Sequence, residues 1–296
     1  MNAAQERQGG LSLALGAYVI WGLLPLYLQF LRHVPPFEFV GWRIIFTLPI
    51  CLIGVTIARQ WSAVRAAISS GRILLIMLAS ALLIGINWLV YVYAVQTGHV
   101  LAASLGYYIN PLVNVLLGTV FLKERLTRPQ WLAVALAAIG VTLLLFGALD
   151  MLWISLSLAL SFGTYGMVRK IAPVESLPGL TIESAILALP ALGLIGYHAQ
   201  LPAASAFGIS GQTDALIAFS GVVTAVPLVM FAAAARRMDY STLGFIQFLT
   251  PTVVFLEGLF IFNEPLRPVQ LGSFVLIWAA IGLFVADLLG RRRSKA

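Results

Sequence analysis

The chain has 296 residues, of which 60% are hydrophobic and only 10% are charged. Charged residues make up about a quarter of a typical soluble domain, so this composition excludes an ordinary soluble protein and predicts an integral membrane protein. The formal net charge of +7 would also suit a nucleic-acid partner, and the positions of the basic residues must decide that point.

Ten apolar stretches are long enough to cross a bilayer. A hydrocarbon core of about 30 Å needs about 20 consecutive apolar residues in a helix. Runs of this length between charges predict an all-α fold with ten membrane helices and short connections. The first stretch follows no signal-peptide pattern, so we expect it to be retained as a signal anchor. The expected spans are 10–30, 37–58, 73–96, 100–122, 129–147, 150–168, 177–198, 213–234, 240–262 and 268–288.

Most lysines and arginines fall in the loops that share a side with the N-terminus. Arg32 and Arg267 fall on the other side, and Arg43 lies within a span. This asymmetry is the positive-inside pattern, so it explains the net charge without nucleic acid and predicts that both termini are cytoplasmic. The lone Cys51 lies within the second span, where it offers neither a disulfide nor a metal site.

The second span carries a charge at mid-membrane, Arg43. Such a charge costs at least ~2.5–3.5 kcal/mol on insertion scales, so it needs a partner or water. Glu183 in the seventh span and Glu38 near the outer end of the second are the candidate partners. A pair of Arg43 with Glu183 would act as a gate or as a permanent structural ion pair, and a buried Glu183 would also suit proton coupling.

The third span combines an amide with aromatic rings. Asn87 and Tyr91 are four residues apart, so they share a helical face, and Trp88 lies beside them. A lining of this kind suits flat or amphipathic organic solutes. The alternative is that Trp88, Tyr91 and Tyr107 of the fourth span only pack against neighbouring helices.

The fourth span contains "SLGYYINPLVNVLLG", residues 104–118, with Asn110 and Asn114 on one helical face. Pro111 removes a backbone donor and should kink the helix. A kinked helix with an amide stripe suits a hydrated cavity that binds substrate. The alternative is hydrogen bonding between helices, worth about 0.5–2 kcal/mol per amide.

The fifth span has a sharp predicted start. Thr127 to Gln130, "TRPQ", forms a capping box with a proline in the first turn. Glu124 just before it and Glu264 before the tenth span are interpreted as boundary residues.

The second half of the chain repeats the first with an offset of 140 residues. The offset aligns Pro111 with Pro251, Gly118 with Gly258, Glu124 with Glu264, Leu126 with Leu266 and Gln130 with Gln270. Because five spans is an odd number, the second copy must cross the membrane in the opposite sense. We therefore expect two inverted five-helix repeats, residues 1–147 and 148–296, as in many secondary transporters.

The ninth span mirrors the fourth. Pro251 should kink it, the Thr250 hydroxyl can satisfy a freed carbonyl, and Gln247 supplies an amide one turn earlier. The two proline-containing helices are expected to face each other as walls of one pathway. Glu257 later in this span either lines the pathway or reaches the outer boundary, and it is a third gating or coupling candidate.

Two other classes of protein remain alternatives. An intramembrane enzyme would need a nucleophile elbow, a Walker loop or a zinc site, and His33, His99 and His198 lack the spacing of zinc ligands. A channel-like facilitator would be expected to show a filter loop or a ring of like charges. We expect no cofactor and no metal.

Several segments resemble one known family. They are "AYVIWGLLPLY" from Ala17, "IGINWL" from Ile84, "ASLGYYINPLVNVLLG" from Ala103, "ERLTRPQWLAV" from Glu124, "YGMVRK" from Tyr165, "TAVPL" from Thr224 and "STLGFIQFLTPT" from Ser241. The chain is similar to the EamA form of the drug/metabolite transporter superfamily, and more closely to its RarD branch, which is named for chloramphenicol sensitivity. It departs from that pattern at Glu257, where a hydrophobic residue would be usual.

The resemblance implies ten helices in a basket-like arrangement, a bacterial inner-membrane location and export of small metabolites or drugs. Together with the repeat, it predicts a secondary transporter that works by alternating access without ATP. The substrate, proton coupling and oligomeric state stay open.

Overall fold

The computed structural model describes residues 3–145, 152–200, 205–263 and 268–293. These ranges form helices joined by short turns. The helices are α1 (Ala3–Gly22), α2 (Leu24–Gln29), α3 (Pro36–Ile57), α4 (Trp61–Ile68), α5 (Gly71–Gln96), α6 (Val100–Val120), α7 (Arg128–Leu145), α8 (Leu152–Ile171), α9 (Ser176–Ala199), α10 (Gly211–Arg237), α11 (Tyr240–Gln247), α12 (Leu249–Phe260) and α13 (Pro268–Arg293).

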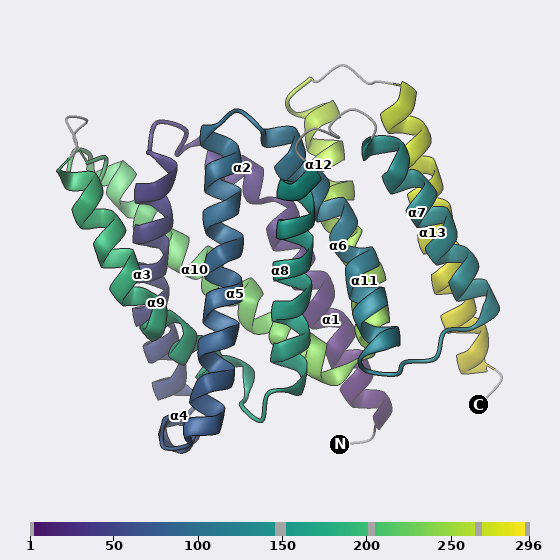
Figure 1. Cartoon of the computed structure of the whole chain (residues 1–296), viewed down its shortest axis with the longest axis horizontal. Helices are drawn as coiled ribbons and strands as arrows, with labels where there is room; N and C mark the ends of the chain where they lie inside the picture. The colour runs from purple at the N-terminus through teal and green to yellow at the C-terminus, as the bar shows by residue number, and fades with distance from the viewer. Residues whose placement is uncertain (1–2, 146–151, 201–204, 264–267, 294–296) are drawn as a thin grey trace.

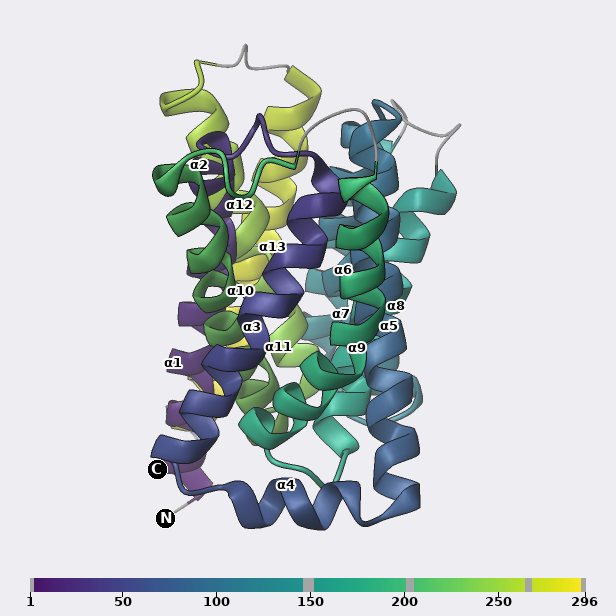
Figure 2. The ribbon, with the colours of Figure 1, turned by 90° about the vertical axis from the view of Figure 1, so that its left-hand side faces the viewer.

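The long helices run between two ends of the molecule (Figure 1). The start of α1 and the end of α13 lie at the same end, which we call the terminal end, and the opposite end is called the far end. The short helix α4 lies across the terminal end, roughly perpendicular to the bundle (Figure 2).

Eight stretches are helices long and apolar enough to cross a membrane, by length and composition. They coincide with eight of the ten expected spans, so the chain is a multi-pass membrane protein. The expected spans 100–122 and 150–168 are also helical, as α6 and α8, but they are not among the eight. Ten crossings therefore stay a prediction. The eight are Gly9–Gln29, Pro36–Ile57, Gly71–Val95, Arg128–Leu145, Ser176–Ala199, Gly211–Arg237, Tyr240–Phe260 and Pro268–Gly290.

Helices from distant parts of the chain pack side by side. The main pairs are α3 with α9, α6 with α8 and α11, α7 with α13, α1 with α10, and α5 with α8. Small residues permit some of these approaches. A Cβ atom on Gly221 of α10 would lie 2.3 Å from the carbonyl oxygen of Phe46 on α3, so this crossing requires glycine.

The two proline-containing spans differ. α6 continues through Pro111 as one helix, whereas the span 240–262 is divided at Phe248 into α11 and α12. Pro251 lacks the N–H that would continue the ladder of helical hydrogen bonds. The Thr250 hydroxyl does not satisfy a carbonyl of its own helix as expected, because it donates to the carbonyl oxygen of Tyr18 on α1 at 2.9 Å.

The predicted capping box at the start of α7 is confirmed. The Thr127 N–H donates to Gln130 Oε1 at 2.9 Å, and the Gln130 N–H donates to Thr127 Oγ1 at 3.3 Å. Glu264, the corresponding boundary residue of the second half, lies outside the described residues. Cys51 is buried and free, as its position in an apolar span indicates.

Candidate substrate cavity

A cavity of about 1010 Å³ lies inside the bundle between the two halves of the chain. Its inner part reaches Asn87 on α5 and Gln247 at the end of α11, and its outer part reaches Val100 and Val269, where α6 and α13 begin at the far end. Helices α1, α2, α3, α5, α6, α7, α8, α10, α11, α12 and α13 all contribute to its wall. A cavity of this size accommodates a small organic molecule.

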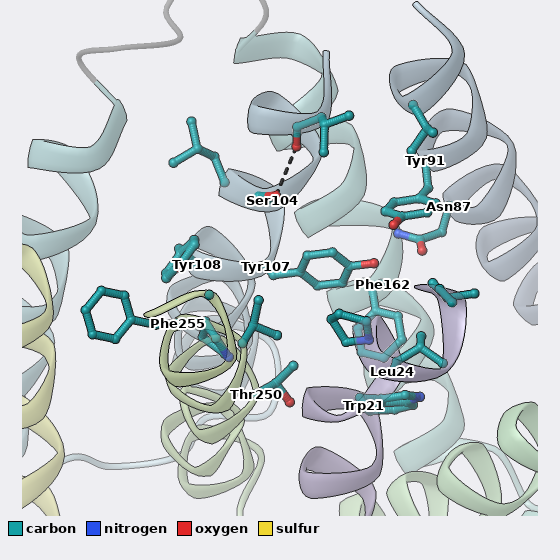
Figure 3. Close-up of a pocket in the computed structure, with 18 of the residues that line it drawn as sticks. Trp21, Leu24, Asn87, Tyr91, Ser104, Tyr107, Tyr108, Phe162, Thr250 and Phe255 are labelled. Carbon is teal, nitrogen blue, oxygen red and sulfur yellow. Dashed lines mark hydrogen bonds between the residues drawn. The ribbon is translucent and has the colours of Figure 1, made fainter. Parts of the chain in front are cut away.

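Aromatic rings dominate the wall. Figure 3 shows the Tyr107 ring extending from α6 with its hydroxyl toward Asn87, above Phe162 and Trp21. The ring centroids of Tyr91 and Tyr107 are 6.3 Å apart in an edge-on arrangement. The aromatic residues of the wall are Trp21, Phe39, Trp88, Tyr91, Tyr107, Tyr108, Phe162, Phe255 and Phe274.

Five of the seven expected substrate-binding residues line the cavity, namely Asn87, Trp88, Tyr91, Tyr107 and Gln247. The amide of Asn87 is held by the neighbouring helix α8. Its Nδ2 donates to the carbonyl oxygen of Leu158 at 2.9 Å and to Ser161 Oγ at 3.0 Å. This fixes the orientation of the amide at the inner part of the cavity.

The remaining two residues, Asn110 and Asn114, are buried and do not belong to the cavity wall. Asn114 Nδ2 donates to Gln247 Oε1 at 2.7 Å, so its amide joins α6 to α11, which is the alternative stated for it. Of the ninth span, it is α11 that packs on α6, whereas α12, which contains Pro251, packs mainly on α1. Asn110 Oδ1 has no hydrogen-bond partner among the described residues.

Arg43 lines the cavity, but neither expected partner contacts it. Its Nε donates to Thr224 Oγ1 on α10 at 3.1 Å, and its Cζ lies 4.8 Å from the ring centroid of Trp88. Within the described residues, the ion pairs join Arg169 to Glu183 and His198 to Glu38. The predicted pairing of Arg43 with Glu183 or Glu38 is therefore wrong.

Glu38 faces away from Arg43, toward the segment between α9 and α10. Its carboxylate accepts hydrogen bonds from the N–H groups of Ala206 at 3.0 Å and Phe207 at 3.2 Å. The Ser205 hydroxyl and the indole N–H of Trp42 also donate to it. These donors occupy the carboxylate that the sequence offered to Arg43.

Glu183 lies in a separate buried cluster that is not part of the cavity wall. Its Oε1 is 3.5 Å from Arg169 Nη1 and accepts a hydrogen bond from Ser80 at 2.5 Å. The Tyr165 hydroxyl donates to Oε2 at 3.3 Å. The sequence placed Arg169 on the cytoplasmic side with the other basic residues, whereas its side chain is fully buried.

Glu257 does not reach the boundary of the bundle. It is 4% exposed, it is absent from the cavity wall, and neither carboxylate oxygen has a hydrogen-bond partner among the described residues. Its neighbour Gly258 does line the cavity.

Glu124 joins the two halves of the chain at the terminal end. Its Oε1 accepts from the N–H of Tyr240 at 2.6 Å, and its Oε2 accepts from the N–H of Ser241 at 2.8 Å and the Ser241 hydroxyl at 2.7 Å. The carboxylate thereby caps the N-terminus of α11. We call these three residues the Glu124 clamp.

Sequence reasoning missed several residues of the site. Trp21, Phe162 and Thr224 occur in apolar runs with no partner at helical spacing to mark them. The Glu124 clamp was also missed, because its donors belong to Tyr240 and Ser241, which are 116 and 117 residues away along the chain. These positions are recognised only from the tertiary contacts.

A bundle of membrane-spanning helices around an aromatic cavity at mid-depth is the architecture of a membrane protein that handles small molecules. Comparison with known proteins gives the family. Residues 8–146 match the EamA-like transporter family. The chain therefore belongs to the EamA/RarD-like branch of the drug/metabolite transporter superfamily, as its full-length relatives also show.

Those relatives match along nearly their whole length. An uncharacterized transporter of Pseudomonas aeruginosa is 43% identical, over 97% of this chain and 96% of that protein. Protein RarD of Escherichia coli is 42% identical over 100% of both chains. A chloramphenicol-sensitive protein RarD of Pseudomonas aeruginosa is 30% identical over 97% of each. A solved crystal structure shares the fold with a TM-score of 0.72 at 19% identity, covering 95% of this chain and 98% of that one.

Proposed function

We propose that this membrane transporter is an inner-membrane secondary carrier that exports small organic molecules by alternating access, without ATP. One observation carries the proposal. The cavity between the halves extends to the far end of the bundle, while the Glu124 clamp joins the halves at the terminal end. A cavity that reaches only one end is the arrangement expected of one state of an alternating carrier.

The packing of the helices supports two inverted repeats. With the offset of 140 residues, α3 corresponds to α9, the fourth span to the ninth and α7 to α13, and the members of each pair pack on each other. The same offset converts the pair of α1 with α10 into the pair of α8 with α5, which also pack together. A two-fold relation between the halves would produce this pattern.

The direction of opening follows from the orientation proposed for the termini. With both termini in the cytoplasm, the far end faces outward and the structure represents an outward-facing state. Loading from the cytoplasm would then require the Glu124 clamp to open. Release outward would use the cavity as it stands.

We assign different roles in transport to the residues in and beside the cavity. We assign substrate contact to Asn87, Trp88, Tyr91, Tyr107 and Gln247, which line the wall, and we assign Asn114 the task of holding Gln247 in place. Asn110, buried without a partner for its Oδ1, would gain one when α6 and α11 move apart. Pro111 and Pro251 would supply the bending of these helices.

Coupling is assigned to the buried carboxylates. An unpaired carboxylate is costly to bury, so Glu257, without a partner in the described residues, is proposed to carry a proton during the cycle. Glu183, held by Arg169, is proposed to keep the buried cluster closed in this state. Glu257→Gln should then keep substrate exchange but lose the dependence of net flux on a pH gradient.

The test is transport by the purified protein in liposomes, screened against drugs, amino acids and other metabolites with and without a pH gradient. A carrier should show saturable flux that is accelerated by unlabelled substrate on the opposite side, and Asn87→Ala should reduce it. Arg65→Gln, a change on the exposed face of α4, is the matched control. Flux without saturation or exchange would indicate a channel-like facilitator, and chemical conversion of a solute in detergent would indicate an enzyme. Either result would overturn the proposal.

A further inference from the structure

The charged side chains described in the cavity wall are all positive. Among the described residues that line it, the charged side chains are Arg32 and Arg43, and no aspartate or glutamate is present. Arg32 is exposed on the segment between α2 and α3, and Arg43 lies two turns into α3. A solute entering from the far end therefore meets positive charge without compensating negative charge.

The guanidinium of Arg43 is held but not neutralised. Nε donates to Thr224 Oγ1, and the guanidinium carbon Cζ lies over the ring of Trp88. The described part of the chain supplies no hydrogen-bond partner and no carboxylate for the two terminal nitrogens. These two nitrogens form the face of a guanidinium that binds a carboxylate through two parallel hydrogen bonds.

Such a group is costly within the membrane unless an anion or water joins it. A cation within a membrane span costs several kcal/mol unless it is paired or hydrated, and the wall residues Trp88, Tyr91 and Tyr107 supply rings and hydroxyl groups but no negative charge. The position of Arg43 thus points to a ligand that brings its own negative charge.

The same wall also restricts the shape and the charge of the rest of the ligand. Stacked and edge-on aromatic rings favour a flat apolar body. An ammonium group would find no carboxylate among the described lining residues. One anchoring guanidinium at mid-depth matches one negative charge on the ligand.

We propose that this carrier selects monoanionic aromatic carboxylates, with Arg43 as the anchor of the carboxylate and Thr224 as the residue that positions the guanidinium. This inference rests on the proposed transport function for its physiological meaning. The binding that it describes can be measured without transport.

The experiment compares three ligands that share one ring system: 2-naphthylacetate, its neutral amide 2-naphthylacetamide, and the zwitterion 2-naphthylalanine. Binding to the detergent-solubilised full chain is measured by calorimetry in a chloride-free buffer at neutral pH, because chloride would compete for the guanidinium. The acid should bind about tenfold or more tightly than the amide or the zwitterion, as expected for charge-assisted hydrogen bonds.

Substitutions locate the effect. Arg43→Gln should abolish the preference for the acid and leave binding of the amide nearly unchanged, whereas Arg65→Gln, with the same loss of charge on α4, should change neither. Thr224→Val should weaken binding of the acid by a smaller factor, and Thr224→Ser, which keeps the hydroxyl, should restore it. A merely structural Arg43 would change both ligands equally.

The outcomes separate the two proposals. Binding of the acid that depends on Arg43, without flux in liposomes, would support the anchor and overturn the transport mechanism. Saturable flux of neutral or zwitterionic solutes with equal or higher affinity, unaffected by Arg43→Gln, would support transport and overturn the anchor.

Discussion

The terminal end and the cavity of this protein use polar groups in opposite ways. At the terminal end, polar side chains bind backbone groups: the Glu124 clamp holds α11, and Arg236 donates to the carbonyl oxygens of Ala172 at 2.7 Å and Val174 at 2.5 Å. In the cavity wall, Arg43 keeps two nitrogens without a protein partner in the described residues.

The difference shows which region stabilises the fold and which is prepared for a ligand. Satisfied hydrogen bonds at the terminal end stabilise the packing of the halves, because each donor has exchanged water for a protein partner. An unsatisfied cation in a cavity lowers stability until something binds it. We therefore expect mutations in the two regions to change stability in opposite directions.

The largest expected effect is at the Glu124 clamp. Glu124→Ala removes the acceptor of three hydrogen bonds at the start of α11, so it should lower the free energy of unfolding by about 2–3 kcal/mol. SDS titration of the purified protein measures this change. Glu175→Ala is the control, since the carboxylate of the exposed Glu175 accepts one hydrogen bond within the described residues, from Gln60 Nε2 at 2.5 Å. Equal losses in the two variants would contradict a special role for the clamp.

The next effect tests the close approach of α11 to α6 beneath the cavity. A Cβ atom on Gly244 would lie 2.8 Å from the carbonyl oxygen of Pro111 and 2.9 Å from Asn114 Cβ. Gly244→Ala should therefore cost about 1–3 kcal/mol by overpacking. Gly272→Ala on α13, where nothing lies within 4 Å of the added carbon, should be neutral or slightly stabilising. Thermal unfolding in detergent compares the two, and an unchanged Gly244→Ala variant would mean that the helices can separate freely.

A gain of stability is expected on the cavity side. Arg43→Met removes a cation with an incomplete set of partners, and it should raise the free energy of unfolding by about 1 kcal/mol, less than the full insertion cost because Arg43 faces the cavity and keeps its hydrogen bond to Thr224. The same SDS titration, without added ligand, measures it. A loss of stability instead would show that Arg43 mainly supports Thr224 and Trp88 as part of the packing.

The smallest effect concerns the amide bridge between the halves. A double-mutant cycle with Asn114→Ala and Gln247→Ala should give a coupling free energy of about 0.6 kcal/mol, typical of hydrogen bonds between membrane helices. Unfolding of the four proteins provides the measurement. Additive effects would indicate that the hydrogen bond at 2.7 Å contributes no net stability.

Part of the site could be read from the sequence because it depends on spacing along one helix. Asn87 and Tyr91 are one turn apart, and both line the cavity as their shared face indicates. The same argument failed for Asn110 and Asn114, which also share a face but are buried outside the cavity wall, with Asn114 bonded to Gln247 of α11. Spacing fixes which residues share a face, whereas the rotation of the helix in the bundle decides what that face meets.

Eight of the membrane helices and the capping box at Thr127 could be predicted without a structure, because both depend on local interactions: apolar runs with lipid, and side chains with the backbone three residues away. The internal repeat also indicated that the fourth and ninth spans would meet, but α6 packs on α11, the first part of the ninth span, whereas α12 with Pro251 packs mainly on α1. The partners of the buried charged residues could not be predicted in this way. Arg43 donates a hydrogen bond to Thr224, 181 positions away, and Glu183 pairs with Arg169. The energy of a buried charge depends on which helices pack around it, and the packing of helices is a property of the tertiary structure.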